Sequence, residues 1–540
     1  MDVGGLLGRA LGPVLLPVKL ARFFRREPSV ASGLVSLRTA IATREERFLA
    51  MARREIYGRP RAVYARLLAR AGCTYEDLLA LVGADGLEAA LARLATEGVR
   101  LTEAEFRGRV DVERSGLRMR VCADDLVPAR FDVGLLANSS GSGGSPLPCL
   151  YPMEWMELEA CVVEAFLGAH ALHDHVHATD DARLTGGAGP KFMAYLGRHG
   201  IGCARWFVRD VPLAGALVRS YHAIVARELA FAGRWFGRGF PRPTAATDVE
   251  VAAWIGSERR AGRHCCVRLA VGRAVDVVRA AANAGIALDG TVFIASGEPL
   301  TAARRRAIEA SGARVIPQYG FVPGGLLGVG CGHPTAPDDM HVMAHTLAVV
   351  GDPEPDATRR RLLVTTLNAR APSIQLNVEN GDVAEIVDRD CGCLLGETGL
   401  RRHVARVGSD RQVTLGGTKY PVEDLVALVE QRLPEQCGGS VGDYQLVEEQ
   451  ESDGRGYLTL RVHPRVTCRA STDLLAALRD GLATGSRGAS FITDLWSRRG
   501  LLRVVRQAPS ASARGKVPAV LTLASHALGA AEAAADAVTE

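Results

Sequence analysis

A small, hydroxyl-rich loop is the stretch of this chain whose residue types are best suited to chemistry. It follows the apolar run at residues 131–137 and covers residues 139–146. It begins with Ser139, Ser140, Gly141, Ser142, Gly143 and Gly144 and ends in Ser145-Pro146. Glycines let the backbone turn its N–H groups toward an anion at close range, and serine hydroxyls donate further hydrogen bonds. The same composition fits a Gly/Ser linker. The loop is predicted to bind phosphate or to be a linker, and other parts of the chain must decide.

Four histidines form a second group with possible chemistry. They have the close spacing of a metal-ligand set and are His170, His173, His175 and His177. A helical stretch is predicted at 157–170, just before them. We therefore interpret them as the end of that helix and the loop after it, with one lining a substrate pocket, rather than as a metal site.

The twelve cysteines of the chain are too few for its length to be a disulfide framework. Most are isolated, as are Cys73, Cys122 and Cys203, and are expected to be buried small hydrophobes in a reducing cytoplasm. Cys391 and Cys393 differ, because a single glycine separates them. This Cys-x-Cys pair sets them apart as candidates for a specific role.

The elements that must position these residues change along the chain. Leucines recur at helical spacings between residue 36 and about residue 107, which predicts helices. The middle of the chain then alternates helical stretches, such as 271–284 and 301–311, with β-like runs, such as 291–295 and 314–317. This alternation predicts an α/β fold with a largely parallel sheet.

Near residue 410 the pattern changes to that of a small α+β domain of about one hundred residues. Strands are predicted at 412–415, 444–449 and 458–463, and helices at 421–433 and 471–482. The predicted organisation is a helical N-terminal segment, an α/β core, a small C-terminal α+β domain and an Ala-rich tail, at residues 1–120, 121–409, 410–524 and 525–540.

Composition excludes several classes of protein. Apolar residues make up 47% and charged residues 23% of the 540 residues, as in globular proteins, and this length requires two or more domains. The net charge of +5 is weak and no basic block is interleaved with aromatics, which argues against nucleic-acid binding. No apolar run is long enough to span a bilayer. Val3 to Val18 lacks the order of a signal peptide, and predicts an amphipathic surface helix with peripheral membrane contact as the alternative.

Several short motifs follow the Ser/Gly loop in order. They are Ser296-Gly297-Glu298-Pro299, Gln318-Tyr319-Gly320-Phe321, Asn380-Gly381-Asp382, Ser409-Asp410 and Gly515-Lys516. This order resembles the adenylate-forming ligases, specifically the phenylacetate–CoA ligase-like branch, over roughly residues 60 to 520. No motif is decisive alone, and the resemblance rests on their order and separations.

The resemblance implies a nucleotide-binding role for four of these motifs. The Ser/Gly loop would hold the triphosphate of ATP, and Ser296, Gly297, Glu298 and Pro299 would form one wall of the adenine pocket. Tyr319, followed by Gly320, would stack on the adenine, although an ordinary core tyrosine is the alternative. Asp382 would accept hydrogen bonds from the ribose hydroxyls, which suits a carboxylate, whereas an Asn-Gly-Asp triplet by itself indicates a turn.

The last two motifs are implied to act through movement of the small domain. Asp410 would be the hinge about which a mobile C-terminal lid rotates between adenylation and thiol transfer. Lys516 would be the catalytic lysine, because in the family this residue bridges the carboxylate and the α-phosphate when the lid is closed. A solvated lysine near the C-terminus is the alternative.

The resemblance also implies a structural zinc site. Some phenylacetate–CoA ligase-like proteins hold zinc with a Cys, a His and a later Cys-x-Cys, which maps to Cys331, His341, Cys391 and Cys393. The interval between the first two looks longer than in the family, so His333 is a rival ligand. Three thiolates and one imidazole suit tetrahedral zinc, and the alternative is a set of unligated buried thiols.

The chain departs from the family at three positions. Pro323 stands where a Glu usually helps to hold Mg²⁺, Ser145 where the phosphate loop usually has a Lys, and Gly408 where the hinge usually has an Arg. Arg406 or Arg411 could compensate for the last departure. Loss of one Mg²⁺ ligand need not abolish activity, because Mg²⁺ can bind mainly through substrate phosphates.

The function implied is ATP-dependent activation of a carboxylic acid as an acyl-adenylate, followed by transfer to a thiol of CoA or of a carrier protein. ATP, Mg²⁺ and CoA would take part, and zinc would be structural. The departures leave two alternatives: transfer to an amine or hydroxyl with amide, ester or N–N bond formation, and a catalytically impaired homologue that binds a ligand. No nucleic-acid partner and no stable membrane insertion are expected.

Overall fold

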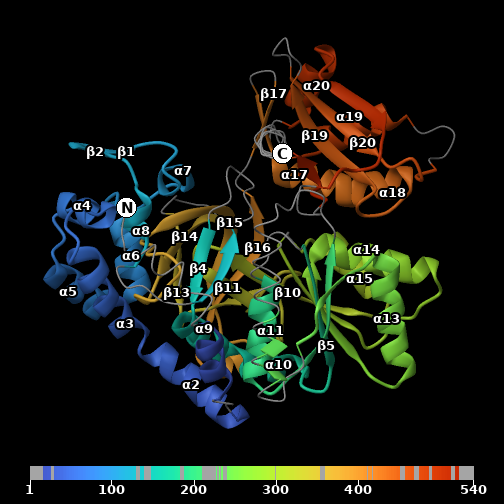
Figure 1. The fold of residues 1–540 in the computed structure, drawn as a ribbon. Helices are drawn as coiled ribbons and strands as arrows, with labels where there is room; N and C mark the ends of the chain where they lie inside the picture. Colours follow the sequence, from blue (N-terminus) through green and yellow to red (C-terminus); the bar gives the residue numbers. More distant parts are fainter. Residues whose placement is uncertain are drawn as a thin grey trace, which may run out of the picture.

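The fold is described from a computed structural model of the chain. Apart from five isolated residues between 227 and 234, the structure describes residues 16–25, 29–128, 134–138, 148–182, 188–209, 240–297, 300–352, 359–409, 412–415, 418–450, 456–467, 473–485, 489–511 and 517–521. These residues form a large domain built on a twelve-stranded sheet and a smaller C-terminal domain with its own four-stranded sheet (Figure 1). The predicted fold class is confirmed.

One half of the large sheet is parallel. Its strand order is β10-β9-β8-β5-β6-β7, with bounds Arg314–Phe321, Val292–Ser296, Cys265–Ala270, Val176–Ala182, Cys203–Arg209 and Pro243–Ala245. Strand β9 is apolar on both faces, because Val292 and Ile294 belong to one core and Phe293 and Ala295 to another, as in parallel sheets covered on both sides. The helices that follow in the chain are α13, α14 and α15, at Asp248–Arg260, Val271–Asn283 and Ala302–Glu309. They lie together at the right of Figure 1.

Two helix starts in this half show how the sequence fixes the element boundaries. The Thr247 hydroxyl accepts from the Glu250 backbone N–H, and the Glu250 carboxylate accepts from the Thr247 N–H, which makes a capping box for α13. Thr301 caps α15 in the same position by accepting from the Arg304 N–H. These side chains satisfy backbone N–H groups that the first helical turn leaves without partners.

The other half of the large sheet is antiparallel. Beyond β10 its order is β11-β12-β16-β15-β14-β13, with bounds Gly325–Gly330, Met340–Val342, Arg402–Ser409, Val378–Asp388, Arg360–Thr366 and Leu347–Gly351. The sequence analysis predicted a largely parallel sheet and the strands β9 and β10, but the strand order of the antiparallel meander was not predicted. Its pairings link distant segments, such as His341 with His403, which local patterns do not reveal.

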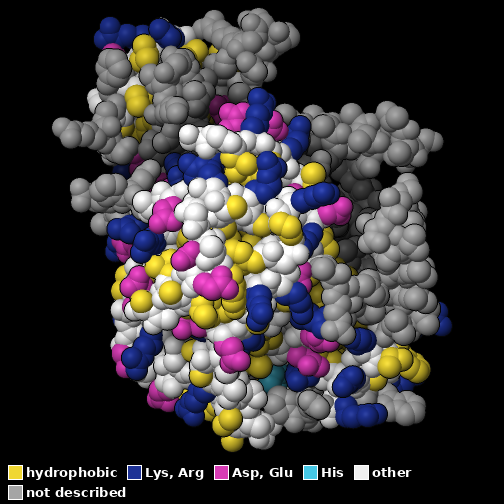
Figure 2. All heavy atoms as spheres, turned by 90° about the vertical axis from the view of Figure 1, so that its left-hand side faces the viewer, with side chains coloured by type: hydrophobic (Ala, Val, Ile, Leu, Met, Phe, Trp, Pro, Cys, Tyr) yellow, Lys and Arg dark blue, Asp and Glu magenta, His cyan; other side chains and the backbone are white. Residues whose placement is uncertain are grey.

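Helices of the N-terminal segment cover the antiparallel half. They are α2, α3, α4, α5, α6 and α7, at Val30–Ala42, Arg44–Met51, Val63–Arg70, Tyr75–Asp85, Leu87–Thr96 and Glu103–Phe106. Apolar residues of α4 to α6 share one core with strand residues such as Ala348 and Leu363. These helices form the left side of Figure 1. On that face, shown in Figure 2, Lys and Arg side chains are interspersed with Asp and Glu.

Of the expected N-terminal surface helix, the structure describes residues 16–25, which are helical. Leu20, Phe23 and Phe24 are at most 1% exposed and lie in the main core of the large domain. The Arg198 guanidinium stacks 4.7 Å from the centre of the Phe23 ring and donates to the Phe23 carbonyl at 2.7 Å. The apolar face of this helix therefore packs inside the protein. Within the described ranges, no helix combines the length and apolar character that crossing a bilayer requires.

The small domain has its own core. Its four-stranded sheet has the order β21-β20-β19-β22, with bounds Leu502–Arg506, Gly456–Val462, Tyr444–Gln450 and Val520–Leu521. The hairpin β17–β18 and the helices α17, α18, α19 and α20 complete it, at Gln412–Leu415, Thr418–Pro421, Val422–Ala427, Leu433–Cys437, Leu474–Ala483 and Ala489–Arg498. Trp496 and Tyr420 are fully buried in this core, with ring centroids 5.6 Å apart.

Ion pairs attach the small domain to the helices of the parallel half. Arg304 of α15 lies 2.6 Å from the Glu430 carboxylate, and both side chains are almost fully buried. The Thr301 hydroxyl donates to the same carboxylate at 2.6 Å. Arg279 of α14 lies 3.8 Å from Asp443. The position of the small domain in this structure is therefore set by specific polar contacts.

Candidate active site and metal centre

Residues predicted to bind the nucleotide meet at the carboxyl edge of the parallel strands. Ser296 ends β9 and is paired in register with Gln318 of β10, which precedes Tyr319. The Tyr319 hydroxyl donates to Asp382 of β15 at 2.5 Å and accepts from the Asn380 side-chain amide at 2.7 Å. Burial and the nearby Asp382 carboxylate raise the pKa of Tyr319, so this hydroxyl stays protonated and is a donor. Ligands of α/β sheets bind at this edge.

Two of the predicted glycines lie at the same edge, at positions where the regular backbone geometry of a strand ends. Gly297 has φ +79°, a left-handed conformation that glycine adopts without strain, immediately after β9 ends. At Gly320 the register between β10 and β11 shifts, and this irregularity ends the regular pairing beside Tyr319. The remaining predicted residues of the active site lie outside the described residues: Ser139, Ser140, Gly141, Ser142, Gly143, Gly144, Glu298, Pro299, Asp410 and Lys516.

The Ser/Gly residues connect two paired strands. β3 (Gly134–Asn138) and β4 (Pro148–Pro152) form an antiparallel hairpin in which Asn138 faces Pro148. Leu135 and Tyr151 of this hairpin are buried in the main core of the large domain. Residues 139–147 therefore join two strands of one hairpin, rather than two domains.

Pro323 lies in a turn whose backbone is held by side chains from elsewhere. The Tyr151 hydroxyl donates to the Val322 carbonyl at 2.6 Å, and the Ser373 hydroxyl donates to the Pro323 carbonyl at 2.8 Å. Just after this turn, the backbone N–H of Leu326 donates to the carboxylate of Glu159. The position of the usual Mg²⁺-holding Glu thus offers no side-chain ligand.

Gly408 leaves room for an arginine from another segment. A Cβ at Gly408 would lie 2.5 Å from Nη2 of Arg359 and 3.0 Å from the Glu423 carboxylate, so a side chain here would displace that ion pair. Arg359 belongs to the large domain and Glu423 to α17 of the small domain. Arg406, one of the two arginines proposed to compensate, is exposed and pairs with Glu385 at 2.5 Å. Arg359 is therefore the guanidinium that occupies the space beside Gly408.

We call the carboxyl edge, where the residues predicted to bind the nucleotide meet, the nucleotide edge. A buried group of charged side chains, which the sequence analysis missed, adjoins it. Arg268 of β8 lies 3.5 Å from the Asp181 carboxylate of β5, and its Nε donates to Gln318 at 3.0 Å. Burial raises the pKa of Asp181 and lowers that of Arg268. The signal in the sequence was an arginine inside the apolar strand that begins at Cys265, which indicates a buried charge.

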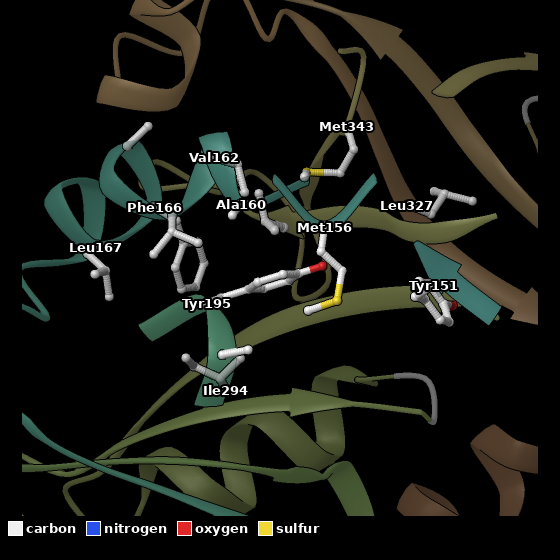
Figure 3. Packing of buried hydrophobic residues seen from close by; sticks show 14 of the residues in the cluster. Tyr151, Met156, Ala160, Val162, Phe166, Leu167, Tyr195, Ile294, Leu327 and Met343 are labelled. Atoms are coloured by element: carbon white, nitrogen blue, oxygen red, sulfur yellow. The ribbon is translucent and has the colours of Figure 1, made fainter. Parts of the chain in front are cut away.

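A second ion pair extends this group into the main core. Lys191 of α11 (Ala188–Arg198) lies 2.9 Å from the carboxylate of Glu159, the last residue of α9 (Met153–Glu159). The Tyr195 hydroxyl donates to the same carboxylate, and the Lys191 ammonium lies 4.2 Å from the centre of the Tyr151 ring. Burial lowers the pKa of Lys191. Figure 3 shows Tyr195 lying among apolar residues that include Met156 and Ile294.

The structure brings all four predicted metal ligands together. They come from the end of β11 (Cys331), from β12 (His341), and from the segment before α16 (Leu394–Glu397), which holds Cys391 and Cys393. The two later sulfurs are 3.3 Å apart, and the His341 Nε2 lies 3.2 Å from the Cys393 Sγ and 3.6 Å from the Cys391 Sγ. The Cys331 thiol is hydrogen-bonded to Cys393. The donors thus converge as the residues of a tetrahedral zinc site would.

The tautomer of His341 also suits a ligand. Its Nδ1 lies 2.6 Å from the Leu400 carbonyl and therefore carries the proton, which leaves the Nε2 lone pair facing the sulfurs. Hydrogen bonds from Cys331 and His341 lower the pKa of Cys393. The rival, His333, is turned elsewhere, because its Nδ1 bonds to the Cys391 carbonyl at 2.9 Å.

One further imidazole faces the same cluster and was missed. His403 of β16 offers an Nε2 without a hydrogen-bond partner, and ligand atoms of Cys331, His341, Cys391 and His403 lie within 4.8 Å of one another. Its Nδ1 is held by the Asp339 carboxylate at 2.8 Å. The pairing of β12 with β16 creates this approach, which sequence spacing does not show.

The four clustered histidines bond to separate partners. His170 ends α10 (Val163–His170) and bonds to the Gly330 carbonyl at 2.9 Å, whereas His173 pairs with Glu164 at 3.0 Å. His175 lies in the loop after α10, and His177 is already in β5, where it bonds to the Leu172 carbonyl at 3.0 Å. These contacts match a helix end and a following loop, extended into a strand, and show no shared ligand position among the described residues.

Comparison with known proteins identifies the fold. The chain matches no family model and no curated protein sequence. Among solved structures, 2-hydroxyisobutyryl-CoA ligase in the post-adenylation state matches with a TM-score of 0.51 in complex with R3-HIB-AMP and of 0.50 in complex with 2-HIB-AMP. In both cases the identity is 15% and 94% of each chain is covered. An amide bond synthetase from Marinactinospora thermotolerans has a TM-score of 0.42 at 14% identity, over 84% of this chain and 91% of that chain. The chain has the fold of the adenylate-forming ligases.

Proposed function

We propose that this chain, which has the fold of the adenylate-forming ligases, is an enzyme that activates a carboxylic acid with ATP and passes the acyl group to a thiol. The observation that carries the proposal is the convergence of Ser296, Tyr319 and Asp382 at the carboxyl edge of the parallel strands. The three residues belong to separate motifs of the sequence and to separate strands of the sheet.

The chemistry proceeds in two steps. A carboxylate oxygen attacks the α-phosphorus of ATP, the bond from that phosphorus to the bridging oxygen of the β-phosphate breaks, and pyrophosphate leaves. The thiol of CoA or of a carrier protein then attacks the acyl carbon, and the bond from this carbon to the AMP oxygen breaks. The products are the thioester and AMP.

Residues of this chain would bind and orient the nucleotide. The Tyr319 ring would stack on the adenine, and Asp382 would accept from the ribose hydroxyls, with Asn380 fixing the position of the Tyr319 hydroxyl. The loop that joins β3 to β4 would hold the phosphates. Lys516 would stabilise the charge that develops on the α-phosphate. Because Pro323 supplies no carboxylate, Mg²⁺ would bind mainly through phosphate oxygens and water.

We propose a structural role for zinc in the same protein. Cys331, His341, Cys391 and Cys393 would hold it in a closed set of three thiolates and one imidazole, with His403 as the neighbouring fifth donor. The support is the convergence of the donors and the His341 tautomer. A closed set leaves no position for substrate, so the metal would tie β11 and β12 to the segment before α16.

The test is acid-dependent exchange of labelled pyrophosphate into ATP across a panel of carboxylic acids. We expect exchange with at least one acid, and we expect Lys516→Ala to lower its rate by about 10²-fold, as for the loss of one transition-state stabiliser. Lys19→Ala, near the opposite end of the chain, is the control and should leave the rate unchanged. Exchange that is absent with every acid would contradict the proposal, and an unaffected Lys516→Ala rate would remove this residue from the mechanism.

A further inference from the structure

The charged group formed by Arg268 and Asp181 lies next to residues predicted to bind ATP. Arg268 contacts Gln318, the residue before Tyr319, and its Nη2 lies 3.4 Å from the Ser296 hydroxyl at the end of β9. The side chains of Arg268 and Asp181 are each 13% exposed and that of Lys191 is 15% exposed, so these charges keep a narrow contact with solvent. A group this deep, polar and adjacent to the nucleotide edge is suited to a substrate rather than to packing.

Several hydrogen-bond donors of this group have no acceptor among the described residues. Among the described residues, two of the five N–H groups of Arg268 make hydrogen bonds, and its Nη1 lies 3.5 Å from Asp181, beyond a good hydrogen bond. The indole N–H of Trp206, in a side chain that is 3% exposed, has no acceptor among the described residues. An unsatisfied buried donor is costly, so an acceptor supplied by a ligand would stabilise it.

Gly189 places that indole beside the carboxylate. A Cβ at Gly189 would lie 1.8 Å from Oδ2 of Asp181 and 3.2 Å from Nε1 of Trp206. The two polar atoms therefore approach the same point on α11 from β5 and β6. Only glycine lets the helix pass so close to both of them. Asp181 thus lies close to the Trp206 indole as well as to Arg268.

The unpaired N–H groups of Arg268 and Trp206 favour a ligand group that accepts hydrogen bonds over one that donates them. An ammonium group would bring only further donors, whereas a carboxylate brings about four lone-pair positions and no donor. The planar fork of an arginine matches a carboxylate, because two parallel N–H groups can point at its two oxygens. Lys191 is paired with Glu159, and Asp181 lies 3.5 Å from Arg268, so the preference rests on the unpaired N–H groups and not on net charge.

We propose that Arg268, assisted by the indole N–H of Trp206, binds a second carboxylate on the acid substrate, so that the enzyme selects dicarboxylic acids and adenylates the carboxylate at the other end. This inference rests on the proposed function and adds the substrate class to it. Arg268 contacts the non-reacting end of the substrate and determines specificity, whereas Lys516 acts at the reacting end.

The test compares matched pairs of acids in the pyrophosphate exchange assay. Each pair has the same carbon skeleton with one or two carboxylates, such as butanoate with succinate, and benzoate with isophthalate or terephthalate. For the best pair, we expect the kcat/KM of the diacid to exceed that of the monoacid by about 10²-fold, as for a buried charge pair that is made or lost. Arg268→Gln should lower kcat/KM for the diacid by about 10²-fold and change that for the monoacid by less than about threefold.

Two variants serve as controls. Arg205→Gln removes an exposed arginine from strand β6 and should leave kcat/KM unchanged for both the diacid and the monoacid. Arg268→Lys keeps the charge but loses the fork, and should give an intermediate loss of about tenfold for the diacid. A wild-type enzyme that uses the monoacids as well as the diacids would overturn the proposal, as would equal losses for both acids in Arg268→Gln.

A binding measurement separates this proposal from the proposed function. The change in melting temperature caused by a diacid alone, without ATP, measures directly whether Arg268 binds its carboxylate. We call this binding position the anchor. A diacid that raises the melting temperature of the wild type but not of Arg268→Gln supports the anchor even if no acid supports exchange. Exchange with monoacids, together with no diacid-dependent shift, contradicts the anchor and leaves the proposed function standing.

Discussion

The Cys/His cluster and the nucleotide edge are built in opposite ways. The cluster joins donors from the antiparallel half of the large sheet, and the donor atoms of His341, Cys391 and Cys393 already lie 3.2 to 3.6 Å from one another. The nucleotide edge spreads its described residues over β9, β10 and β15. A closed, preassembled set suits a structural metal, whereas residues spread along the open edge of a sheet suit a substrate. Changes in the first should affect stability, and changes in the second should affect activity.

The largest effect is expected from loss of the metal. Purified protein should contain about one equivalent of zinc, and Cys331→Ala should abolish it and lower the melting temperature by roughly 10 °C, because a structural zinc site contributes its binding free energy to folding. Metal analysis and thermal denaturation measure both. Cys149→Ala removes a buried thiol outside the cluster and is the control for packing. Less than about a tenth of an equivalent of zinc, with no chelator added, would contradict the assignment.

A smaller effect, and the opposite pattern, is expected at the nucleotide edge. Asp382→Asn removes the charged acceptor for the ribose and should raise KM for ATP by about 10- to 100-fold, as for a hydrogen bond to a charged group. Its zinc content should match that of the wild type, and its melting temperature should be within about 2 °C. A fall in melting temperature as large as that of Cys331→Ala would mean that the two regions do not divide stability and activity between them.

The smallest effect is expected in the pH dependence of stability. It comes from buried histidines of the core and not from the Cys/His cluster. Burial lowers the pKa of His177 to about 4 and of His345 to about 3, from an ordinary value of about 6.5. Between pH 6.5 and 4 the unfolded chain binds these protons and the folded chain does not, so stability falls as pH falls. Each histidine contributes a slope of about 1.4 kcal/mol per pH unit.

Urea titrations between pH 6 and 5 in the presence of a chelator measure this slope without a contribution from metal release. His345→Phe should reduce the slope of the wild type by about 1.4 kcal/mol per pH unit. His264→Phe is the control, because this histidine is exposed to solvent in the folded protein. An unchanged slope in His345→Phe would show that His345 does not remain neutral in the folded core.

The sequence allowed the fold class to be predicted because local signals and tertiary packing agree over the parallel half. The predicted helix at 271–284 is α14, and the predicted strands at 291–295 and 314–317 lie in β9 and β10. In the small domain, the predicted strands at 444–449 and 458–463 are β19 and β20. The strand order of the antiparallel half was not predicted, because it depends on pairings between distant segments that no local pattern encodes.

The same distinction explains which site residues were found. Cys391 and Cys393 are recognisable because their spacing is local, and Tyr319 and Asp382 because each belongs to a short motif. His403 reaches the cluster only because β16 pairs with β12. Arg268 meets Asp181 only because β5 lies next to β8 in the sheet. Contacts of this kind are a property of the sheet order and not of any segment.

The proposed adenylation joins a carboxylate oxygen of the substrate to the α-phosphorus of ATP. The most direct measurement supplies the best acid from the exchange panel with both carboxylate oxygens labelled with ¹⁸O, together with ATP and the thiol acceptor, and determines the mass of the AMP formed. Attack by the carboxylate leaves its bridging oxygen on phosphorus when the thiol displaces AMP, so each AMP should carry one ¹⁸O. Formation of ADP and phosphate, or of AMP without the label, would contradict the account.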